Sequence, residues 1–134
     1  MNRWVLRLVD RTIPPATTCG EKLDDRIPEA GQVWWVQLAP TMGTEQSGKR
    51  PFLVLSPRAV NEVIGKAIGV SISRTNHEWQ TEIALSTLPH PCVAQTDHIR
   101  TLDFDARKAE FRGHKVTEAE LESVREAVRP LLGL

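Results

Sequence analysis

Arg50 is the residue whose type and setting most strongly predict a chemical role in this chain. It follows a stretch at 39–49 with two glycines, a proline and several small polar residues, and it precedes Pro51 and an apolar run. A side chain at the point where a loop becomes a strand can be held firmly and still leave space for a ligand. Because its planar guanidinium matches two phosphate oxygens and stays charged, Arg50 suits a phosphate clamp. Lys49 adds positive charge and Glu45 is a carboxylate that can hold Arg50 or accept a proton, although the spacing alone also fits a surface arginine paired with a glutamate.

Histidine, cysteine and tryptophan residues further along the chain suggest two other kinds of chemistry. His90, Cys92 and His98 carry metal-ligating atoms, but their spacing fits no standard zinc motif and a fourth ligand is missing. We therefore expect no metal site and no cofactor. His77 and Trp79 lie in a polar loop, where the tryptophan either stacks on an unpaired nucleobase or folds onto the body of the protein.

Short strands separated by turn residues must position these side chains. Runs of β-branched, aromatic and apolar residues predict strands, and a helical turn is expected at 57–63 because Pro57 suits a first helical position. The expected strands are Gln32–Gln37, Phe52–Ser56, Ala67–Ser73, Thr81–Leu85, Cys92–Gln95 and Ile99–Leu102, with a further short strand at Trp4–Val9. Trp34 and Trp35 should point to opposite faces of their strand, one into the core and one partly exposed.

A helix is predicted at the C-terminal end. Thr117 and Glu120 have the spacing of a capping box, and Val116 and Leu121 are placed to form the accompanying hydrophobic staple. Pro130 is expected to kink or weaken the last turn. The apolar residues that recur at helical spacing are Leu121, Val124, Val128 and Leu131. Short strands followed by one packed helix predict a mainly β fold, a small antiparallel barrel with a C-terminal α-helix.

Length and charge limit the organisation and the partners. The 134 residues fit one folded domain, which we place at 31–134, and the three prolines, the threonines and Gly20 within 1–30 predict a weakly structured extension. Seventeen basic residues balance seventeen acidic ones, whereas a non-specific polyanion binder is normally basic, so a nucleic acid would be bound by a local site. The early apolar stretch is too short to cross a membrane, and we expect a cytoplasmic protein with no membrane contact. Two cysteines are too few for a disulfide framework.

The segment 31–57, GQVWWVQLAPTMGTEQSGKRPFLVLSP, closely resembles the N-terminal signature of the MazF/PemK toxins. That signature is a strand with a tryptophan, then P-T-x-G-x-E-Q-x-G-x-R-P, then an apolar strand ending near S-P. The eight matching positions within twelve residues are Pro40, Thr41, Gly43, Glu45, Gln46, Gly48, Arg50 and Pro51. Weaker similarity continues through 31–134, and we recognise no counterpart of residues 1–30.

The resemblance implies an SH3-like (CcdB/MazF/PemK-type) barrel and the toxin of a type II toxin–antitoxin system. Its activity would be that of a sequence-specific, metal-independent endoribonuclease acting on single-stranded RNA. Without a metal, the ribose 2′-hydroxyl serves as the nucleophile and leaves 2′,3′-cyclic phosphate and 5′-hydroxyl ends. The resemblance also implies a homodimer and a cognate antitoxin whose acidic, flexible segment blocks the RNA site.

The same resemblance assigns roles to individual residues. Arg50 would stabilise the charged phosphoryl group and donate the leaving-group proton, while Glu45 orients Arg50 or serves as the base. Ser73 stands where the family has a threonine that holds a phosphate oxygen, and Ser71 is the alternative if the alignment shifts by two residues. The residues expected to contact substrate are Thr41, Thr44, Gln46, Lys49, Arg74, His77, Gln95 and Asp97.

Two departures from the family pattern bear on specificity. Thr44 stands where PemK-type members have a histidine, which favours the MazF branch. In the second family signature, which the segment 95–103 resembles, Asp97 matches an aspartate linked to substrate recognition and Gln95 replaces an arginine. As bare residues, Asp97 and Arg100 are better explained as caps of a hairpin turn.

Two alternatives to the ribonuclease remain open. The same barrel occurs in toxins that bind and poison DNA gyrase without cleaving anything, although these lack the E-Q-x-G-x-R-P loop. Ser73 and Gln95 also fit a degenerate, non-catalytic RNA-binding module.

Overall fold

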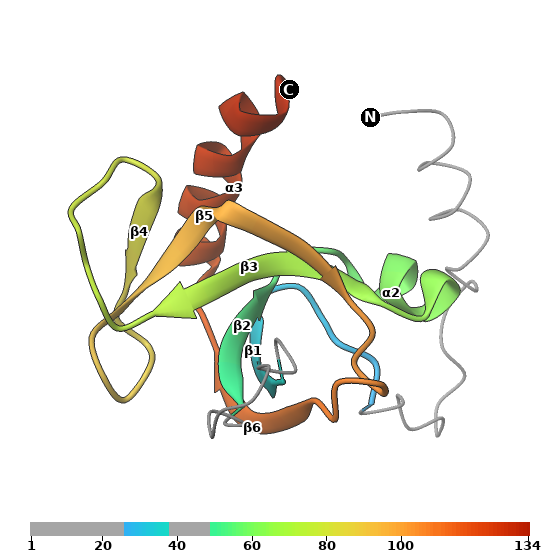
Figure 1. Cartoon of the computed structure of the whole chain (residues 1–134). Coiled ribbons are helices and arrows are strands. Elements are labelled where there is room, and N and C mark those ends of the chain that lie inside the picture. The colour runs from blue at the N-terminus through green and yellow to red at the C-terminus, as the bar shows by residue number, and fades with distance from the viewer. Residues whose placement is uncertain (1–25, 38–48) are drawn as a thin grey trace, which may run out of the picture.

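A curled antiparallel sheet with one long helix forms the structure, a computed structural model that describes residues 26–37 and 49–134. The elements are β1 (Gln32–Val36), β2 (Arg50–Val54), α2 (Arg58–Ile64), β3 (Ala67–Ser73), β4 (Glu82–Leu85), β5 (Cys92–Leu102), β6 (Glu110–Lys115) and α3 (Glu118–Leu132). The strand order is β4-β5-β3-β2-β1-β6, and every pair is antiparallel. The sheet curls into a half-barrel, with α3 against β4 and β5 and α2 in the β2–β3 connection (Figure 1). This confirms the mainly β fold with a C-terminal helix.

Apolar side chains pack on both faces of the curled sheet. On one face, Val33 and Leu53 pack with Leu121 of α3 in one buried cluster. The second cluster contains Trp34, Val36, Phe52, Val54, Ala67, Leu102 and Phe104. Because successive strand residues point to opposite faces, the consecutive residues at 52–54 reach both clusters and are fully buried. Trp34 is buried and Trp35 half-buried, as predicted.

The second strand begins and ends two residues earlier than predicted. Arg50 and Pro51 pair with β1, opposite Val36 and Trp35. The amides of residues 55 and 56 instead both donate to the carbonyl of Ile68, at 2.9 and 3.1 Å, and so leave the ladder. Pro57 is the N-cap of α2, with an extended ψ of 151°, and is not its first helical residue. Arg50 is therefore the first residue of a paired strand.

The prediction of two short strands at 92–95 and 99–102 is wrong, because β5 runs through both. Its register against β3 shifts between the pairs Val70–Ile99 and Ser71–Gln95, so residues 96–98 form a bulge. The amide and hydroxyl of Thr96, which is fully buried, both donate to the carbonyl of Thr81, at 3.0 and 2.6 Å. The turn-forming residues of this segment therefore bend one strand and do not end it, and the prediction of a hairpin turn capped by Asp97 and Arg100 is wrong.

β6 was not predicted, and its composition explains why. Its sequence is EFRGHK, and five of its six residues are exposed. Among the described strands it pairs with β1 alone, at the edge of the sheet, so it has no need of an apolar face. A strand whose side chains face solvent leaves no alternating apolar pattern to detect.

The C-terminal helix is capped as predicted. Thr117 is its N-cap and makes the full capping box with Glu120, and Val116 and Leu121 are both buried. Leu131 was expected on the buried face, but it is 46% exposed because the last turn of α3 extends past the sheet (Figure 1). Pro130 lies inside the helix, which continues to Leu132. Neither helix in the described ranges is long and apolar enough to span a membrane.

Candidate functional site

The pairing register of β2 with β3 brings Arg50 and Ser73 together. The register pairs Leu53 with Val70 and Phe52 with Ser71. Continued by two residues, it places Arg50 opposite Ser73, at the end of β3. Side chains opposite one another in an antiparallel pair share a face and lie about 5 Å apart at Cβ. Both side chains line the same groove.

The same face carries two further polar side chains. Val70 and Ile72 belong to the cluster that packs on α3, so alternation turns Ser71 and Ser73 to the opposite face. Gln95 of β5 pairs with Ser71 and shares this face. Ser71, named as the alternative to Ser73, is therefore its neighbour on the face and is itself part of the groove lining.

These residues line an open groove of about 860 Å³. Its described lining includes Lys49, Arg50, Arg74 and Arg112, and no aspartate or glutamate. A chain with equal numbers of acidic and basic residues thus gathers cations along one surface. The groove has the sign of charge that a polyanion requires.

Glu110 lies beside the groove and organises two of these cations. Its carboxylate accepts a hydrogen bond from Lys49 at 3.1 Å and another from Arg112 at 3.4 Å. The bond from Lys49, followed by that from Arg112, lowers the pKa of Glu110. Arg112 also lies over the indole of Trp35, 4.8 Å from the ring centroid.

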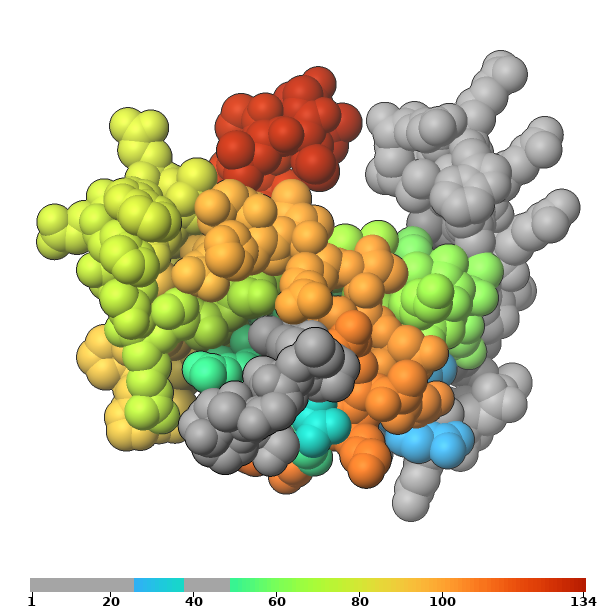
Figure 2. Space-filling model, in the orientation of Figure 1, coloured from blue at the N-terminus to red at the C-terminus, as the bar shows by residue number. Residues whose placement is uncertain are grey.

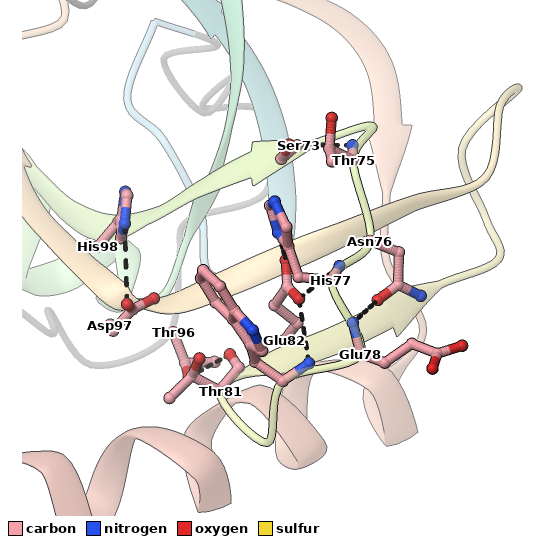
Figure 3. Close-up of polar contacts among 11 residues, drawn as sticks. Ser73, Thr75, Asn76, His77, Glu78, Thr81, Glu82, Thr96, Asp97 and His98 are labelled. Atoms are coloured by element: carbon pink, nitrogen blue, oxygen red, sulfur yellow. Dashed lines mark hydrogen bonds and ion pairs between the residues drawn. The ribbon is translucent and has the colours of Figure 1, made fainter.

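The hydroxyl of Ser73 is oriented by the chain that follows it. Its oxygen accepts a hydrogen bond from the amide of Thr75 at 3.1 Å (Figure 3). This turn leaves the hydroxyl proton available as a donor to a bound oxygen. Cys92 also lines the groove, but burial, with the Glu120 carboxylate as second cause, raises the pKa of its thiol. The thiolate needed for nucleophilic attack is therefore disfavoured.

Glu120 joins the helix cap to one wall of the groove. Its carboxylate accepts hydrogen bonds from the amide of Ser86 at 2.7 Å and from the hydroxyl of Thr87 at 2.8 Å, in addition to those from Thr117. Ser86 and Thr87 begin the β4–β5 loop, which contributes residues 88–90 to the groove. Partial burial alone would raise the pKa of Glu120, but the hydrogen bonds from Ser86, Thr117 and Thr87 outweigh it and lower the pKa to about 2.

This lowered pKa predicts acid sensitivity that depends on Glu120. The ionised form is favoured by folding, so its contribution is complete above about pH 5 and is lost as the pH falls toward 2. We expect Glu120→Gln to reduce the free energy of unfolding by about 1 kcal/mol at pH 7, because partial exposure of Glu120 weakens the full electrostatic effect. At pH 3 the reduction should be less than about half of the reduction at pH 7. Urea unfolding at both pH values measures this. Glu118→Gln, which alters an exposed residue of the same turn, is the control, and an equal loss at both pH values would contradict the prediction.

The structure separates the other predicted site residues into three groups. Lys49, Arg74 and Gln95 lie in the groove with Arg50 and Ser73. His77 and Asp97 are not among the lining residues of the groove. His77 contacts Glu82, and on the β5 bulge Oδ2 of Asp97 lies 3.8 Å from Nε2 of His98 (Figure 3). The residues that lie outside the described ranges are Thr41, Thr44, Glu45 and Gln46.

Several groove residues were not identified from the sequence as site residues, and three of them, on β1 and β6, carry rings or a cation. These three are Trp35, Arg112 and His114, and the last two come from the unpredicted strand β6. The rings of Trp35 and His114 lie 5.3 Å apart. The basic character of 112–115 was the one available signal, but without β6 nothing connected it to Arg50. In the described part of the chain no three His, Cys, Asp or Glu side chains form a metal-binding group.

The fold and the groove together define a small, curled β protein with a cationic surface groove. Residues 29–132 match the family model described as PemK-like, MazF-like toxin of type II toxin-antitoxin system. The endoribonuclease toxin MazF of Escherichia coli K12 is 32% identical over 107 residues, which cover 80% of this chain and 96% of that protein. The crystal structure of MazF from Deinococcus radiodurans superposes with a TM-score of 0.70 at 35% identity, over 81% of this chain and 98% of that one.

The chain belongs to the PemK/MazF family of toxins of type II toxin–antitoxin systems. A MazE-MazF structure from Deinococcus radiodurans is similar as well, with a TM-score of 0.72, 33% identity, and coverage of 81% of this chain and 98% of that one. The family predicted from the segment 31–57 is confirmed.

Proposed function

We propose that this protein is an endoribonuclease toxin that cleaves single-stranded RNA at specific sequences without a metal ion. The observation that carries the proposal is that Arg50 and Ser73 line one groove, which has four cations and no acidic residue in its described lining. Relatives named endoribonuclease MazF and endoribonuclease PemK, at 32% and 34% identity, support the activity. Neither of these two relatives favours the gyrase-poison alternative.

The geometry supports cleavage by internal attack. The ribose 2′-oxygen bonds to phosphorus and the 5′-oxygen leaves, which gives a 2′,3′-cyclic phosphate and a 5′-hydroxyl. Negative charge grows on the phosphoryl oxygens, where the Arg50 fork can bind two of them and the Ser73 hydroxyl one. Arg50 also donates the proton to the leaving oxygen. We propose Glu45, in the stretch outside the described residues, as the group that orients Arg50 or removes the 2′-proton.

The remaining substrate contacts are proposed from both parts of the chain. Lys49, Arg74 and Gln95 would hold the RNA in the groove, and Asp97 would contact it from the β5 bulge. The contacts proposed for the stretch outside the described residues are Thr41, Thr44 and Gln46.

A cognate antitoxin is proposed as the protein partner. The groove's cations suit the acidic, flexible segment expected of an antitoxin. MazE-MazF structures from Deinococcus radiodurans, and a mycobacterial endoribonuclease in complex with its cognate antitoxin, support this partner. We further propose a homodimer acting in the cytoplasm, with 31–134 as the toxin domain and 1–30 as an extension.

RNA cleavage in the presence of a chelator tests the function. The purified protein is incubated with a long unstructured RNA, with and without EDTA, and with single-stranded DNA of the same sequence. We expect the same discrete RNA fragments in both RNA reactions and intact DNA. Uncut RNA, cutting abolished by EDTA, or cutting of the DNA would each contradict the proposal.

Ser73 should contribute its hydroxyl to the rate. A hydrogen bond to a charged oxygen is worth about 1.5–3 kcal/mol, so Ser73→Ala should lower kcat about 10- to 100-fold. Ser73→Thr keeps the hydroxyl, restores the family residue and restricts χ1, so it should retain activity. Single-turnover kinetics on a short RNA measure both variants. Equal rates for Ser73→Ala and wild type would transfer the role to Ser71.

A further inference from the structure

The segment between β3 and β4 carries an exposed pair of aromatic rings that the proposed cleavage chemistry does not use. The imidazole of His77 stacks on the indole of Trp79, with ring centroids 4.4 Å apart and 16° between the ring planes. Trp79 nevertheless remains 57% exposed. Of the two options that the sequence left open for Trp79, this exposure favours an indole that is available for stacking.

A buried carboxylate holds this ring pair in place. The side chain of Glu82 is only 2% exposed, and it accepts hydrogen bonds from the amides of His77 and Trp79 at 2.9 and 3.2 Å. Its second oxygen lies 3.2 Å from Nδ1 of His77 (Figure 3). Burial alone would raise the pKa of Glu82, but the hydrogen bond from the His77 side chain, with those from the two amides, lowers it and keeps the carboxylate ionised. The rings are therefore positioned before any ligand arrives.

The turn between the two rings is also fixed. Glu78 adopts a left-handed conformation, with φ of 59°. Its amide donates to the side-chain oxygen of Asn76 at 2.8 Å (Figure 3), and the amide of Glu82 donates to the carbonyl of Trp79 at 3.0 Å. Such local bonds reduce the ordering cost that a flexible loop would incur on binding.

The ring pair follows the groove lining closely in the chain. Ser73, Arg74 and Thr75 line the groove, and His77 follows two residues later. Four residues of extended backbone span at most about 14 Å, so the Cα atom of His77 lies within about 14 Å of that of Ser73. The chain from the end of β3 through β4, in yellow-green, forms one edge of the molecule, and side chains project from it into solvent (Figure 2).

We propose that the His77–Trp79 pair is a stacking platform for an unpaired nucleobase of the RNA, next to the linkage that is cut; this rests on the proposed function. A flat, pre-positioned indole face four residues beyond the lining of a cationic groove matches a strand whose phosphates follow the cations and whose bases have π faces. Because stacking tolerates any base, the platform adds affinity and fixes the position of the RNA strand along the groove. Selection of the RNA sequence then depends on residues of the groove. Glu82 is the positioning residue of the platform.

Binding of an uncleavable RNA tests the platform. The probe is a short RNA that carries the preferred cut sequence with a 2′-O-methyl group at the cleaved ribose, and its affinity is measured by fluorescence anisotropy. We expect Trp79→Ala to weaken binding about tenfold, and Trp79→Phe, which keeps a ring, to weaken it less. Leu134→Ala, at an 80% exposed residue of the C-terminus, is the control and should bind as wild type does. Circular dichroism verifies that each variant is folded.

Abasic substitution identifies the stacked base. Removal of the base at one position of the probe should weaken binding to wild type about tenfold but should not weaken binding to Trp79→Ala further. The platform is overturned if Trp79→Ala binds RNA as tightly as wild type does, or if Trp79→Ala weakens binding of an acidic antitoxin peptide and not of RNA. If the wild-type protein still cuts RNA in either of those cases, the proposed function is retained and only the platform is rejected. A wild-type protein that neither binds nor cuts RNA would contradict both the platform and the proposed function.

Discussion

Replacing Arg50 by alanine is expected to lower kcat for RNA cleavage by about 100- to 1,000-fold, the range found when a donor to a developing oxyanion is removed. Arg50 is exposed at the first position of β2, so the change should leave the fold intact. Its loss removes a fixed, bidentate positive charge from the place where phosphoryl charge develops. Single-turnover rates on one RNA, with saturating protein, separate this effect from any loss of binding.

Two further variants sharpen the result for Arg50. Arg50→Lys keeps the charge but loses the planar fork, and its rate should fall between those of Arg50→Ala and wild type. Arg129→Ala removes an exposed arginine of α3, far along the sequence from the groove lining, and should cut RNA at the wild-type rate. A folded Arg50→Ala protein with full activity would contradict the proposed mechanism.

Gly69→Ala is expected to produce the largest loss of stability among single substitutions of the glycines in the described ranges. Gly69 lies in β3 between β2 and β5, opposite Val54 and Arg100. A Cβ at this position would lie 2.0 Å from the carbonyl oxygen of Leu53 and 2.8 Å from Cε1 of Phe52. Because the first of these is a backbone atom in the centre of the sheet, the strands would have to separate. We expect the free energy of unfolding to fall by about 3 kcal/mol or more, or the protein to fail to fold.

Gly65→Ala is the matched control for that loss. Gly65 follows α2 with φ of 70°, and a Cβ at this position would have no atom within 4 Å among the described residues beyond its immediate neighbours. The substitution should cost only about 1–2 kcal/mol, because an L-residue is strained in a left-handed conformation. Urea unfolding followed by circular dichroism measures both variants. Equal losses of unfolding free energy for the two variants would show that a Cβ beside the Leu53 carbonyl does not destabilise the sheet.

The parts of the fold that depend on a pattern of nearby residues could be predicted from the sequence. Ala67–Ser73 has the bounds of the predicted strand, and the capping box of Thr117 and Glu120 is formed. β6 could not be predicted, because an edge strand with exposed side chains has no apolar periodicity. The continuity of β5 was equally hidden, since it depends on the contact of Thr96 with Thr81, fifteen residues away in the chain.

The site shows the same division between local and tertiary information. Arg50 could be singled out from its neighbours in the sequence, but its position opposite Ser73 depends on the register of β2 with β3. Register depends on the buried face of each strand and on the connection between them, and the connection here contains α2, so no short turn fixed the pairing in advance. The roles of Arg112 and His114 in the groove require β6 to fold against β1, and the platform of His77 and Trp79 requires the buried carboxylate of Glu82.

The chemical ends of the RNA fragments test the proposed cleavage mechanism most directly. Wild-type protein is incubated in EDTA with a short RNA that contains the preferred cut sequence, and with the same RNA carrying a single 2′-deoxyribose at the cleaved position; mass spectrometry then identifies the termini. The mechanism predicts a 2′,3′-cyclic phosphate and a 5′-hydroxyl from the first RNA and no cleavage of the second. Fragments with 3′-hydroxyl and 5′-phosphate ends, or cleavage at the deoxyribose, would contradict it, because neither can arise from attack by the 2′-hydroxyl.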